Sequence, residues 1–520
     1  MVTARFSRRR RKRELLQKPR GQFTSRVHAV QPEHFGIVSV DCAKARSKFL
    51  LADFYGQVLI APTWVDHTQS SLLAATQHIR QAMSQHDLRD LLVAIERTGE
   101  YHRPVQRAFR AAGWDTRLVH PYASKQFRQP ADPGNKTDDT DLGGIFRAAV
   151  NGFGLLELPW PADYQQLQLL IRHRRDLVGK TTTLCNQIRE RLHAAMPGYA
   201  ECVENLWRCP VALLIARHTG CAAAVRQLGY PGLRQLAEQG ERRCHMTTLT
   251  KILAWAETAE AGHPQSDFLR RMLMALDDDR LEKTRQICAL ERTGANLLAH
   301  TPYLLLLAIP GINVVSAADL AGELGPLLHY ANANAITGRA GLVPSRYQSD
   351  DVDRANGPLR RCAHRRLRAV LLQIADNLVA CNHYFSVRAG RWALAGKDPR
   401  WVRVKIAKIF SRIAYAMVAG RQLFPHPCCQ PRHYILDKLL AFHREHQTPM
   451  DQVLLDLQAA TEQLPRSAYR DEAAPLSQRL QALQASRRGP QPLGDILPIV
   501  LARLGIDAIQ SNTVRDQDPG

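Results

Sequence analysis

The feature that most constrains this chain is a series of short apolar runs in its first quarter, where three strand-like runs precede helices and strands in alternation. The three runs are separated only by short polar or glycine-containing gaps, which predicts three consecutive strands. The elements after them alternate helix and strand, as an α/β layer requires. The expected strands are residues 35–40, 48–52, 57–60, 91–95 and 116–120, and the expected helices are residues 69–85 and 105–112.

A meander of three strands followed by such units is typical of the RNase H-like fold, in which acidic residues gather at strand ends. From residue 161 onward the strand signal fades, and leucine and isoleucine recur at helical intervals among arginine and glutamine. This spacing predicts a long amphipathic helix that, with a second one over residues 268–298, forms a coiled coil. Residues 202–265 would then be an insertion between the two arms.

A third region is expected around Pro310 and Gly311, where the pattern predicts a helix, a tight turn and a helix rich in small residues. Such a turn exposes backbone N–H groups that can hold a phosphate, as in helix-hairpin-helix DNA binders, although an ordinary helical turn has the same pattern. The chain after Tyr384 is expected to be mostly helical. The expected parts are a basic disordered arm over 1–33, an RNase H-like catalytic domain over 34–155, a helical coiled-coil region over 160–299, a helix-hairpin-helix-like domain over 300–384 and a helical extension over 385–520.

The charge of the chain indicates its partner. Lys and Arg number 70 against 48 Asp and Glu, which gives a net charge of +22 and favours a polyanion, with nucleic acid first. A basic membrane-surface protein needs a polybasic amphipathic helix or a lipid anchor, and neither pattern is found, nor is an apolar run long enough to span a membrane. The basic stretch Arg8 to Arg13 lacks the apolar core of a secretory signal.

The cysteines indicate a reducing compartment. Eleven are scattered without the spacing of a disulfide framework, so a bacterial cytoplasm, in association with the nucleoid, is the expected location. One local cluster contains His426, Cys428, Cys429 and His433. Adjacent cysteines lack the two-residue gap of a zinc knuckle, so the spacing does not favour metal binding.

Four carboxylates follow the pattern of a metal site. Asp41 comes directly after the first predicted strand and Glu96 after the fourth, so neighbouring parallel strands would present both at one edge of the sheet. Asp138 and Asp141 are three residues apart at the start of a predicted helix, which places them on one face. Two-metal phosphodiester chemistry requires such a set, because Mg²⁺ or Mn²⁺ prefers oxygen ligands. A strand end, a pairing with arginine and a helix cap are the structural alternatives for the individual residues.

The blocks around these carboxylates resemble those of the DEDD transposases of the insertion-sequence 110 family, whose amino-terminal half is RuvC-like. The blocks are Val40-Asp-Cys-Ala-Lys44, Glu96-Arg-Thr-Gly-Glu-Tyr101, Lys136-Thr-Asp-Asp-Thr-Asp141, Ile309-Pro-Gly-Ile312 and Gly341-Leu-Val-Pro-Ser-Arg-Tyr-Gln-Ser349. Two departures are Asp350, where the family usually has Gly, and Leu142-Gly143-Gly144, where the family usually has Ala after the last acidic residue. Each glycine costs that helix about 1 kcal/mol relative to Ala.

The resemblance implies that Ser349, in a polar loop over residues 345–357, is the nucleophile of a carboxy-terminal transposase domain. On its own, a hydroxyl there would be read as solvated. The helix after the loop has an apolar stripe on one side, while cations fill the other faces and are expected to bind a nucleic-acid backbone. These cations are Arg360, Arg361, His364, Arg365, Arg366 and Arg368.

The resemblance therefore implies a DNA transposase or recombinase that cuts and rejoins the DNA of an insertion sequence, with Mg²⁺ at Asp41, Glu96, Asp138 and Asp141. It also implies guidance by a structured RNA and a homodimer or homotetramer in which domains of different subunits share a site. Composition alone supports only the binding of some nucleic acid. The alternatives are a RuvC-like nuclease that uses water and a non-catalytic nucleic-acid-binding protein.

Overall fold

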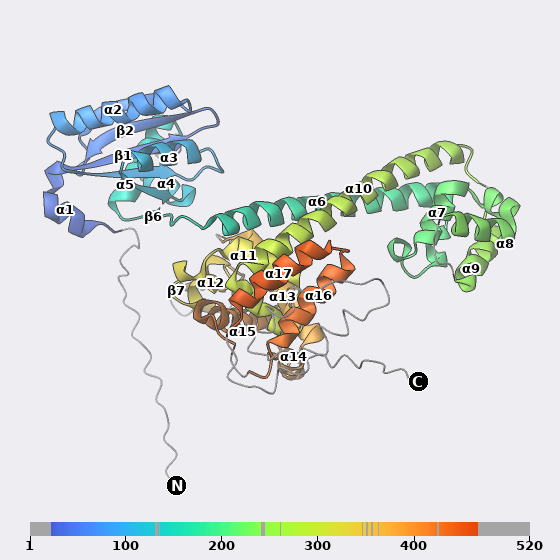
Figure 1. The fold of residues 1–520 in the computed structure, drawn as a ribbon. Coiled ribbons are helices and arrows are strands. Elements are labelled where there is room, and N and C mark those ends of the chain that lie inside the picture. The colour runs from blue at the N-terminus through green and yellow to red at the C-terminus, as the bar shows by residue number, and fades with distance from the viewer. Residues whose placement is uncertain are drawn as a thin grey trace, which may run out of the picture. The chain divides into compact units, whose positions relative to one another are not determined.

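The computed structural model describes residues 22–130, 134, 136–240, 245–260, 262–345, 347–349, 352–354, 357–361, 363–423 and 426–465. The chain divides into two units, Met1–Pro159 and Trp160–Gly520 (Figure 1). The basic stretch Arg8 to Arg13 lies outside the described residues. No helix in the described ranges is both long enough and apolar enough to cross a membrane.

The first unit contains a mixed six-stranded sheet with the order β3-β2-β1-β4-β5-β6. The strands β1, β2 and β3 form the expected antiparallel meander, and β4 and β5 continue from β1 in parallel. The short β6, which the sequence did not predict, pairs antiparallel with β5. The bounds are β1 Phe35–Cys42, β2 Arg46–Asp53, β3 Val58–Asp66, β4 Asp90–Glu96, β5 Asp115–Val119 and β6 Gly154–Leu156.

Helices cover both faces of this sheet, so its central strands are buried on both sides. Val38 and Val40 of β1 pack in one core with α2 (Gln69–Gln85) and α3 (Arg103–Ala111). Ile37, one residue out of phase, packs in the other core with α1 (Thr24–Val30) and α5 (Asp138–Val150). The alternation follows from the two-residue period of a strand. The predicted strands and helices of this region, and its α/β layering, are confirmed.

The amino-terminal arm differs from the expectation for residues 1–33, because its last part is folded onto the sheet. Phe23 and Val27 are 5% and 4% exposed. Arg26 forms ion pairs with Asp90 at 2.6 Å and Asp115 at 2.5 Å. The apolar side chains and the paired guanidinium hold α1 against the strand ends, although its sequence is basic.

The second unit begins with α6 (Ala162–Ala195), which lies along α10 (Ser266–Ala299) in the opposite direction. Arg174 of α6 pairs with Glu291 of α10 at 2.5 Å. The two expected long helices are therefore present, while their coiled-coil character stays a prediction. Between them lie α7 (Pro210–Thr219), α8 (Ala222–Gln239) and α9 (Met246–Thr258), which form a core of their own with the adjoining ends of α6 and α10.

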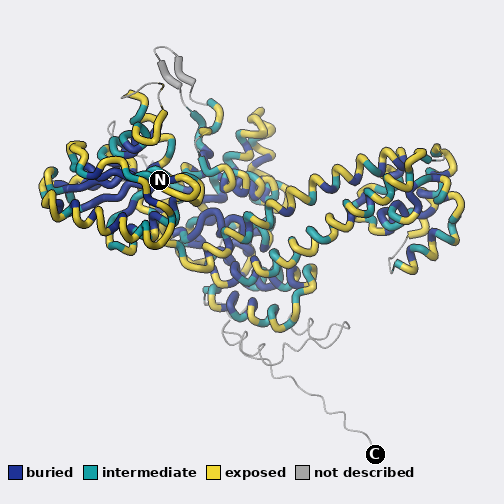
Figure 2. Tube along the Cα trace, turned by 90° about the horizontal axis from the view of Figure 1, so that it is seen from above, coloured by how far each residue is buried: buried dark blue, intermediate teal, exposed yellow. Residues whose placement is uncertain are grey.

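The remaining helices share a single hydrophobic core, visible as the dark interior of the helical part in Figure 2. The expected division between residues 384 and 385 is therefore not a boundary between cores, because helices on both sides of it contribute. The elements are the 3₁₀ helices η4 Pro302–Ala308 and η5 Leu327–His329, the helices α11 Val314–Leu324, α12 Ala333–Arg339, α13 Arg365–Cys381, α14 His383–Leu394, α15 Pro399–Gly420, α16 His433–Glu445 and α17 Met450–Gln463, and the strands β7 Tyr347–Ser349 and β8 Val352–Arg354.

The turn at Pro310 and Gly311 differs from the expected helix-hairpin-helix, because the element before it is the buried 3₁₀ helix η4. The turn packs within the unit. Lys438 donates to the carbonyls of Ile309 and Ile312 at 2.9 and 2.7 Å. Gly311 has φ +95°, and a Cβ there would lie 2.9 Å from the carbonyl oxygen of Asn377. These contacts give the glycine a packing role and do not support a phosphate grip.

Candidate acidic site and serine hairpin

The register of the sheet brings Asp41 and Glu96 to the same edge. In the parallel pair β1 and β4, Val40 is opposite Ile95. The residues that follow them, Asp41 and Glu96, are therefore neighbours. Asp41 and Glu96 are both partly buried there. The carboxyl ends of two neighbouring parallel strands thus supply two of the four carboxylates.

The helix α5 supplies the other two from its first turn. Its N-cap is Thr137, whose hydroxyl accepts from the N–H of Thr140 in a capping box, so the cap is a threonine and not one of the aspartates. Asp138 and Asp141 follow on one face, the first exposed and the second partly buried. The positive end of the helix dipole stabilises their negative charge.

The four carboxylates interact electrostatically. Burial is the largest cause that raises the pKa of Asp41 to about 6, and the negative charges of the other three carboxylates raise it further. Within the described ranges, no three of these residues bring their oxygens within 4.8 Å of one another. Carboxylates that lie near one another repel when no cation neutralises them. Because their oxygens are hard donors, such a group fits a divalent cation such as Mg²⁺.

Three polar side chains that the sequence reasoning missed adjoin this acidic edge. The hydroxyl of Ser124, in α4 (Pro121–Arg128), donates to Glu96 at 2.5 Å. Arg128, from the same helix, forms an ion pair with Asp141. Lys136 lies 3.9 Å from Asp141. Ser124 and Arg128 hold two of the carboxylates in place, and both cations offset part of the negative charge.

A glycine makes this arrangement possible. A Cβ on Gly144 of α5 would lie 2.7 Å from the carbonyl oxygen of Ser124 and 3.1 Å from the Cβ of Arg128. Helix α4 can approach α5 only because Gly144 has no side chain. This residue, which the sequence presents as a cost to the helix, therefore has a packing role beside the acidic edge, and a mid-helix glycine was the only signal for it.

The nearest competing acidic residues are engaged elsewhere. Asp139 forms an ion pair with Lys48 at 2.6 Å. Glu100 pairs with Arg103 at 3.1 Å and is largely exposed. Neither contributes to the electrostatic environment of Asp41 as the other three carboxylates do.

The structure places Ser349 at the end of β7, opposite Val352 of β8, and not in an irregular loop. The hairpin continues at its base, where Pro344 bridges Leu359 and the hydroxyl of Ser345 donates to the carbonyl of Pro358 at 3.0 Å. Ser349 belongs to the second unit, and the four carboxylates belong to the first.

Two of the six cations after the hairpin make contacts within the protein. Arg368 donates to the carbonyl of Ala340 at 2.8 Å and to that of Arg360, so its guanidinium ties together the two ends of the hairpin. His364 is the N-cap of α13, and its other ring nitrogen lies 3.6 Å from the buried Glu323. Backbone carbonyls and Glu323 thus engage these two residues within the protein, and their contact with nucleic acid stays a prediction. Four exposed cations remain: Arg360, Arg361, Arg365 and Arg366.

Two segments of the chain match models of transposase families. Residues 38–197, which contain all four carboxylates, match the DEDD transposase model of the IS110 group. Residues 303–388, which contain Ser349, match the model described as the transposase IS116/IS110/IS902 family. The chain belongs to the IS110 family of transposases.

Proteins similar to this transposase are also transposases or come from insertion elements. The chain is 26% identical over 332 residues to a probable family 20 transposase of Pseudomonas aeruginosa, an alignment that covers 63% of this chain and 84% of the relative. It is 26% identical over 219 residues to the uncharacterized 44.8 kDa protein of insertion element IS116 from Streptomyces clavuligerus, covering 40% and 53%. It is 28% identical over 171 residues to the transposase of insertion sequence IS1328 from Yersinia enterocolitica, covering 32% and 51%. The match spans about half the length of the last two.

Membership in the family identifies the transposase as an enzyme that acts on DNA, and DEDD transposases imply a divalent metal.

Proposed function

We propose that this transposase cuts and rejoins insertion-sequence DNA with Asp41, Glu96, Asp138 and Asp141 as ligands of Mg²⁺ or Mn²⁺ and with Ser349 as the nucleophile. The observation that carries the proposal is the placement of the four carboxylates around one sheet edge, where burial, and then the negative charges of the other three, raise the pKa of Asp41 to about 6. The strand order β3-β2-β1-β4-β5 supports an RNase H-like fold for the first unit.

The metal, when bound, would withdraw charge from the scissile phosphate and stabilise the attacking and leaving oxygens. The acidic residues hold it, and Ser124 and Arg128 orient Glu96 and Asp141. The Oγ of Ser349 forms a bond to phosphorus while the bond from phosphorus to a deoxyribose oxygen breaks. The serine proton leaves to solvent, and the released sugar oxygen takes up a proton. The phosphoserine link conserves the energy of the broken bond for rejoining.

The serine and the carboxylates come from different units of the chain, which is consistent with an active site shared between subunits of a dimer or tetramer. A structured guide RNA is a further part of the proposal. The net charge of +22 and the exposed Arg360, Arg361, Arg365 and Arg366 support the binding of a nucleic acid and are compatible with either DNA or RNA.

The decisive experiment compares two serines of one hairpin. Wild-type protein, incubated with donor and target DNA, Mg²⁺ and any required RNA, should give a denaturant-resistant adduct on the peptide that contains Ser349. Ser349→Ala should bind DNA yet lose both cleavage and adduct. Ser345→Ala is the control, because its hydroxyl donates to the carbonyl of Pro358 at the base of the hairpin. Cleavage by Ser349→Ala at the wild-type rate would show that water is the nucleophile and that the protein is a RuvC-like nuclease.

A further inference from the structure

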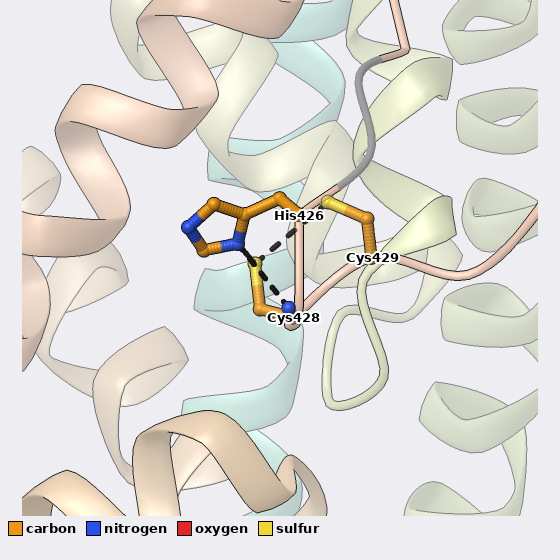
Figure 3. Close-up of side chains that lie close together, drawn as sticks. All are labelled: His426, Cys428 and Cys429. Carbon is orange, nitrogen blue, oxygen red and sulfur yellow. Dashed lines mark hydrogen bonds between the residues drawn. The ribbon is translucent and has the colours of Figure 1, made fainter.

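Three metal-ligating side chains converge in the second unit, at a place that the proposed reaction does not use. His426, Cys428 and Cys429 each offer one ligand atom, and these atoms lie within 4.8 Å of one another (Figure 3). No other group of this kind occurs in the described part of the chain. The spacing alone argued against metal, since adjacent cysteines lack the gap of a zinc knuckle.

A tight turn removes that objection. The N–H of Cys429 donates to the carbonyl of His426 at 2.8 Å, with Pro427 at the second position, which proline favours. Adjacent side chains of a strand point to opposite faces, but this turn brings the sulfur atoms of Cys428 and Cys429 to 3.7 Å. Two thiolates on a tetrahedral zinc, each bonded at about 2.3 Å, lie about 3.8 Å apart. The two sulfurs therefore already have the spacing of two ligands of one ion.

The surroundings are those of a soft metal site. The Nδ1 of His426 lies 3.0 Å from the sulfur of Cys428. The imidazole packs edge-on against the ring of Tyr384, with centroids 4.8 Å apart, which fixes its orientation. The thioether of the fully buried Met417 lies 4.0 Å from the sulfur of Cys429. Sulfur and imidazole donors select zinc or Cu(I), and not the hard ions that carboxylates bind.

We propose that His426, Cys428 and Cys429 bind a thiophilic metal ion of the zinc or Cu(I) class, separate from the ion at the acidic edge. Binding converts the two thiols to thiolates and releases their protons to solvent. The imidazole nitrogen exchanges its contact with the Cys428 thiol for the metal.

The position of this site makes its role structural. The turn joins α15 to α16. Asn382, between α13 and α14, donates to the carbonyl of Cys428 at 3.0 Å. The N–H of Gln430 donates to the carbonyl of Ala308 at 2.8 Å. A bound ion therefore fixes the point where the carboxy-terminal helices meet the segment that precedes the Pro310 turn.

The first test measures binding by the purified full chain, reduced and free of metal. One Co²⁺ per chain should give a thiolate charge-transfer absorption that Zn²⁺ displaces, and a parallel titration with Cu(I) under anaerobic conditions tests the other ion. Cys428→Ser and Cys429→Ser should each lower the affinity by at least 100-fold. Cys381→Ser, an exposed cysteine of the same unit, should bind like the wild type. Mg²⁺ at the carboxylates gives no thiolate absorption, so this result is independent of the transposition chemistry.

A second measurement uses only the wild-type protein, so it does not depend on whether a variant folds. The wild-type protein is treated with a maleimide with and without the ion, and the labelled peptides are mapped. The metal should protect Cys428 and Cys429 at least tenfold while Cys381 reacts as before. Equal labelling with and without Zn²⁺ or Cu(I), or a disulfide between the adjacent cysteines in protein that takes up neither ion after reduction, overturns the proposal.

Discussion

Arg128 forms an ion pair with Asp141, so one of the four carboxylates at the acidic edge has a cationic partner from its own chain. Both side chains are shielded, at 13% and 15% exposed. A shielded charge that loses its partner destabilises the fold, because it is neither paired nor fully hydrated.

Replacement of this arginine should therefore make the first unit more dependent on metal. Arg128→Ala should lower the stability of the metal-free protein by about 1–3 kcal/mol. Mg²⁺ should then raise the melting temperature more in the variant than in the wild type, because the ion neutralises Asp141. Arg103→Ala, which removes a partner of Glu100 and Glu157, is the control and should leave the Mg²⁺ shift unchanged. Equal shifts in all three proteins would contradict the placement of the metal.

The raised pKa of Asp41 predicts a pH-dependent stability. Its carboxyl has a pKa of about 6 in the fold against 3.8 for the ordinary group, so the fold favours the protonated form. Stability from this group is full below about pH 4 and is lost as the pH rises through 6. Asp41→Asn should therefore stabilise the metal-free protein at pH 7–8 by about 1 kcal/mol, after allowance for its partial exposure.

The pH comparison itself checks this prediction. Thermal unfolding of the two proteins in a chelator should show a difference at pH 8 that vanishes near pH 4. Asp139→Asn, which removes a carboxylate paired with Lys48, should not reproduce this pattern. A difference that is constant with pH would mean that neither burial nor the neighbouring carboxylates raise the pKa of Asp41.

DNA cleavage should depend on the carboxylates of the acidic edge and not on Asp139, which pairs with Lys48. Glu96→Gln, Asp138→Asn and Asp141→Asn should each lower Mg²⁺-dependent DNA cleavage by at least about 100-fold, because each removes the charge of a proposed ligand. Asp139→Asn should keep cleavage within a few-fold of the wild type. Gel assays at several Mg²⁺ concentrations check this, and full activity in any of the first three variants would remove that residue from the site.

Replacing neighbouring arginines by alanine should affect different properties, DNA binding in one case and stability in the other. Arg365→Ala and Arg366→Ala, at exposed positions, should weaken binding to DNA of any sequence and lower its salt dependence by about one unit of slope for each phosphate that is no longer neutralised. Arg368→Ala should leave the slope unchanged and destabilise the hairpin, because its guanidinium binds the carbonyls of Ala340 and Arg360. Binding isotherms at several salt concentrations, together with denaturant unfolding, distinguish the two effects.

Two adjacent glycines offer the sharpest test of packing. Gly144→Ala should destabilise the first unit by about 1–3 kcal/mol, because the new methyl group would meet the backbone of α4 at 2.7 Å. Gly143→Ala meets only the end of the Arg147 side chain at 3.4 Å, so it should be neutral or stabilise the helix by up to about 1 kcal/mol. Chemical denaturation measures both. Equal effects would show that α4 does not need the glycine to approach α5.

The elements that could be predicted from the sequence are those governed by local periodicity. The strand that ends near Asp41 and the strand that ends at Glu96 have continuous apolar runs, so their shared edge followed from strand order. The partners Ser124 and Arg128 could not be predicted, because their helix reaches the acidic edge through a tertiary contact at Gly144. The contacts of Arg368 with the carbonyls of Ala340 and Arg360 could not be predicted for a related reason, since a run of arginines does not show which of them meets backbone carbonyls.

The sequence pattern was misleading at two turns, the one at Pro310 and Gly311 and the one over His426 to Cys429. A proline and a glycine between apolar runs predicted an exposed turn, but Lys438 binds the carbonyls beside it from a distant part of the chain. Adjacent cysteines lack the two-residue gap of a zinc knuckle and so did not favour metal binding, but the turn at Pro427 brings the sulfur atoms of Cys428 and Cys429 to 3.7 Å. The surroundings of the Pro310 turn depend on a distant residue, and the approach of the two sulfur atoms depends on the conformation of a local turn, neither of which the residue spacing encodes.

The antiparallel pair of α6 and α10 also sets the distance between two hydrophobic cores of the second unit. Each helix has 34 residues and thus spans about 50 Å. The chain goes out along one helix and returns along the other, so α7, α8 and α9 are held at the far end by a core that includes Ile188 and Leu273. A tip of this kind can be lengthened, shortened or exchanged without disturbing the register of the helices that support it. The length of the two helices therefore sets the distance between the core of the tip and the core at their other end.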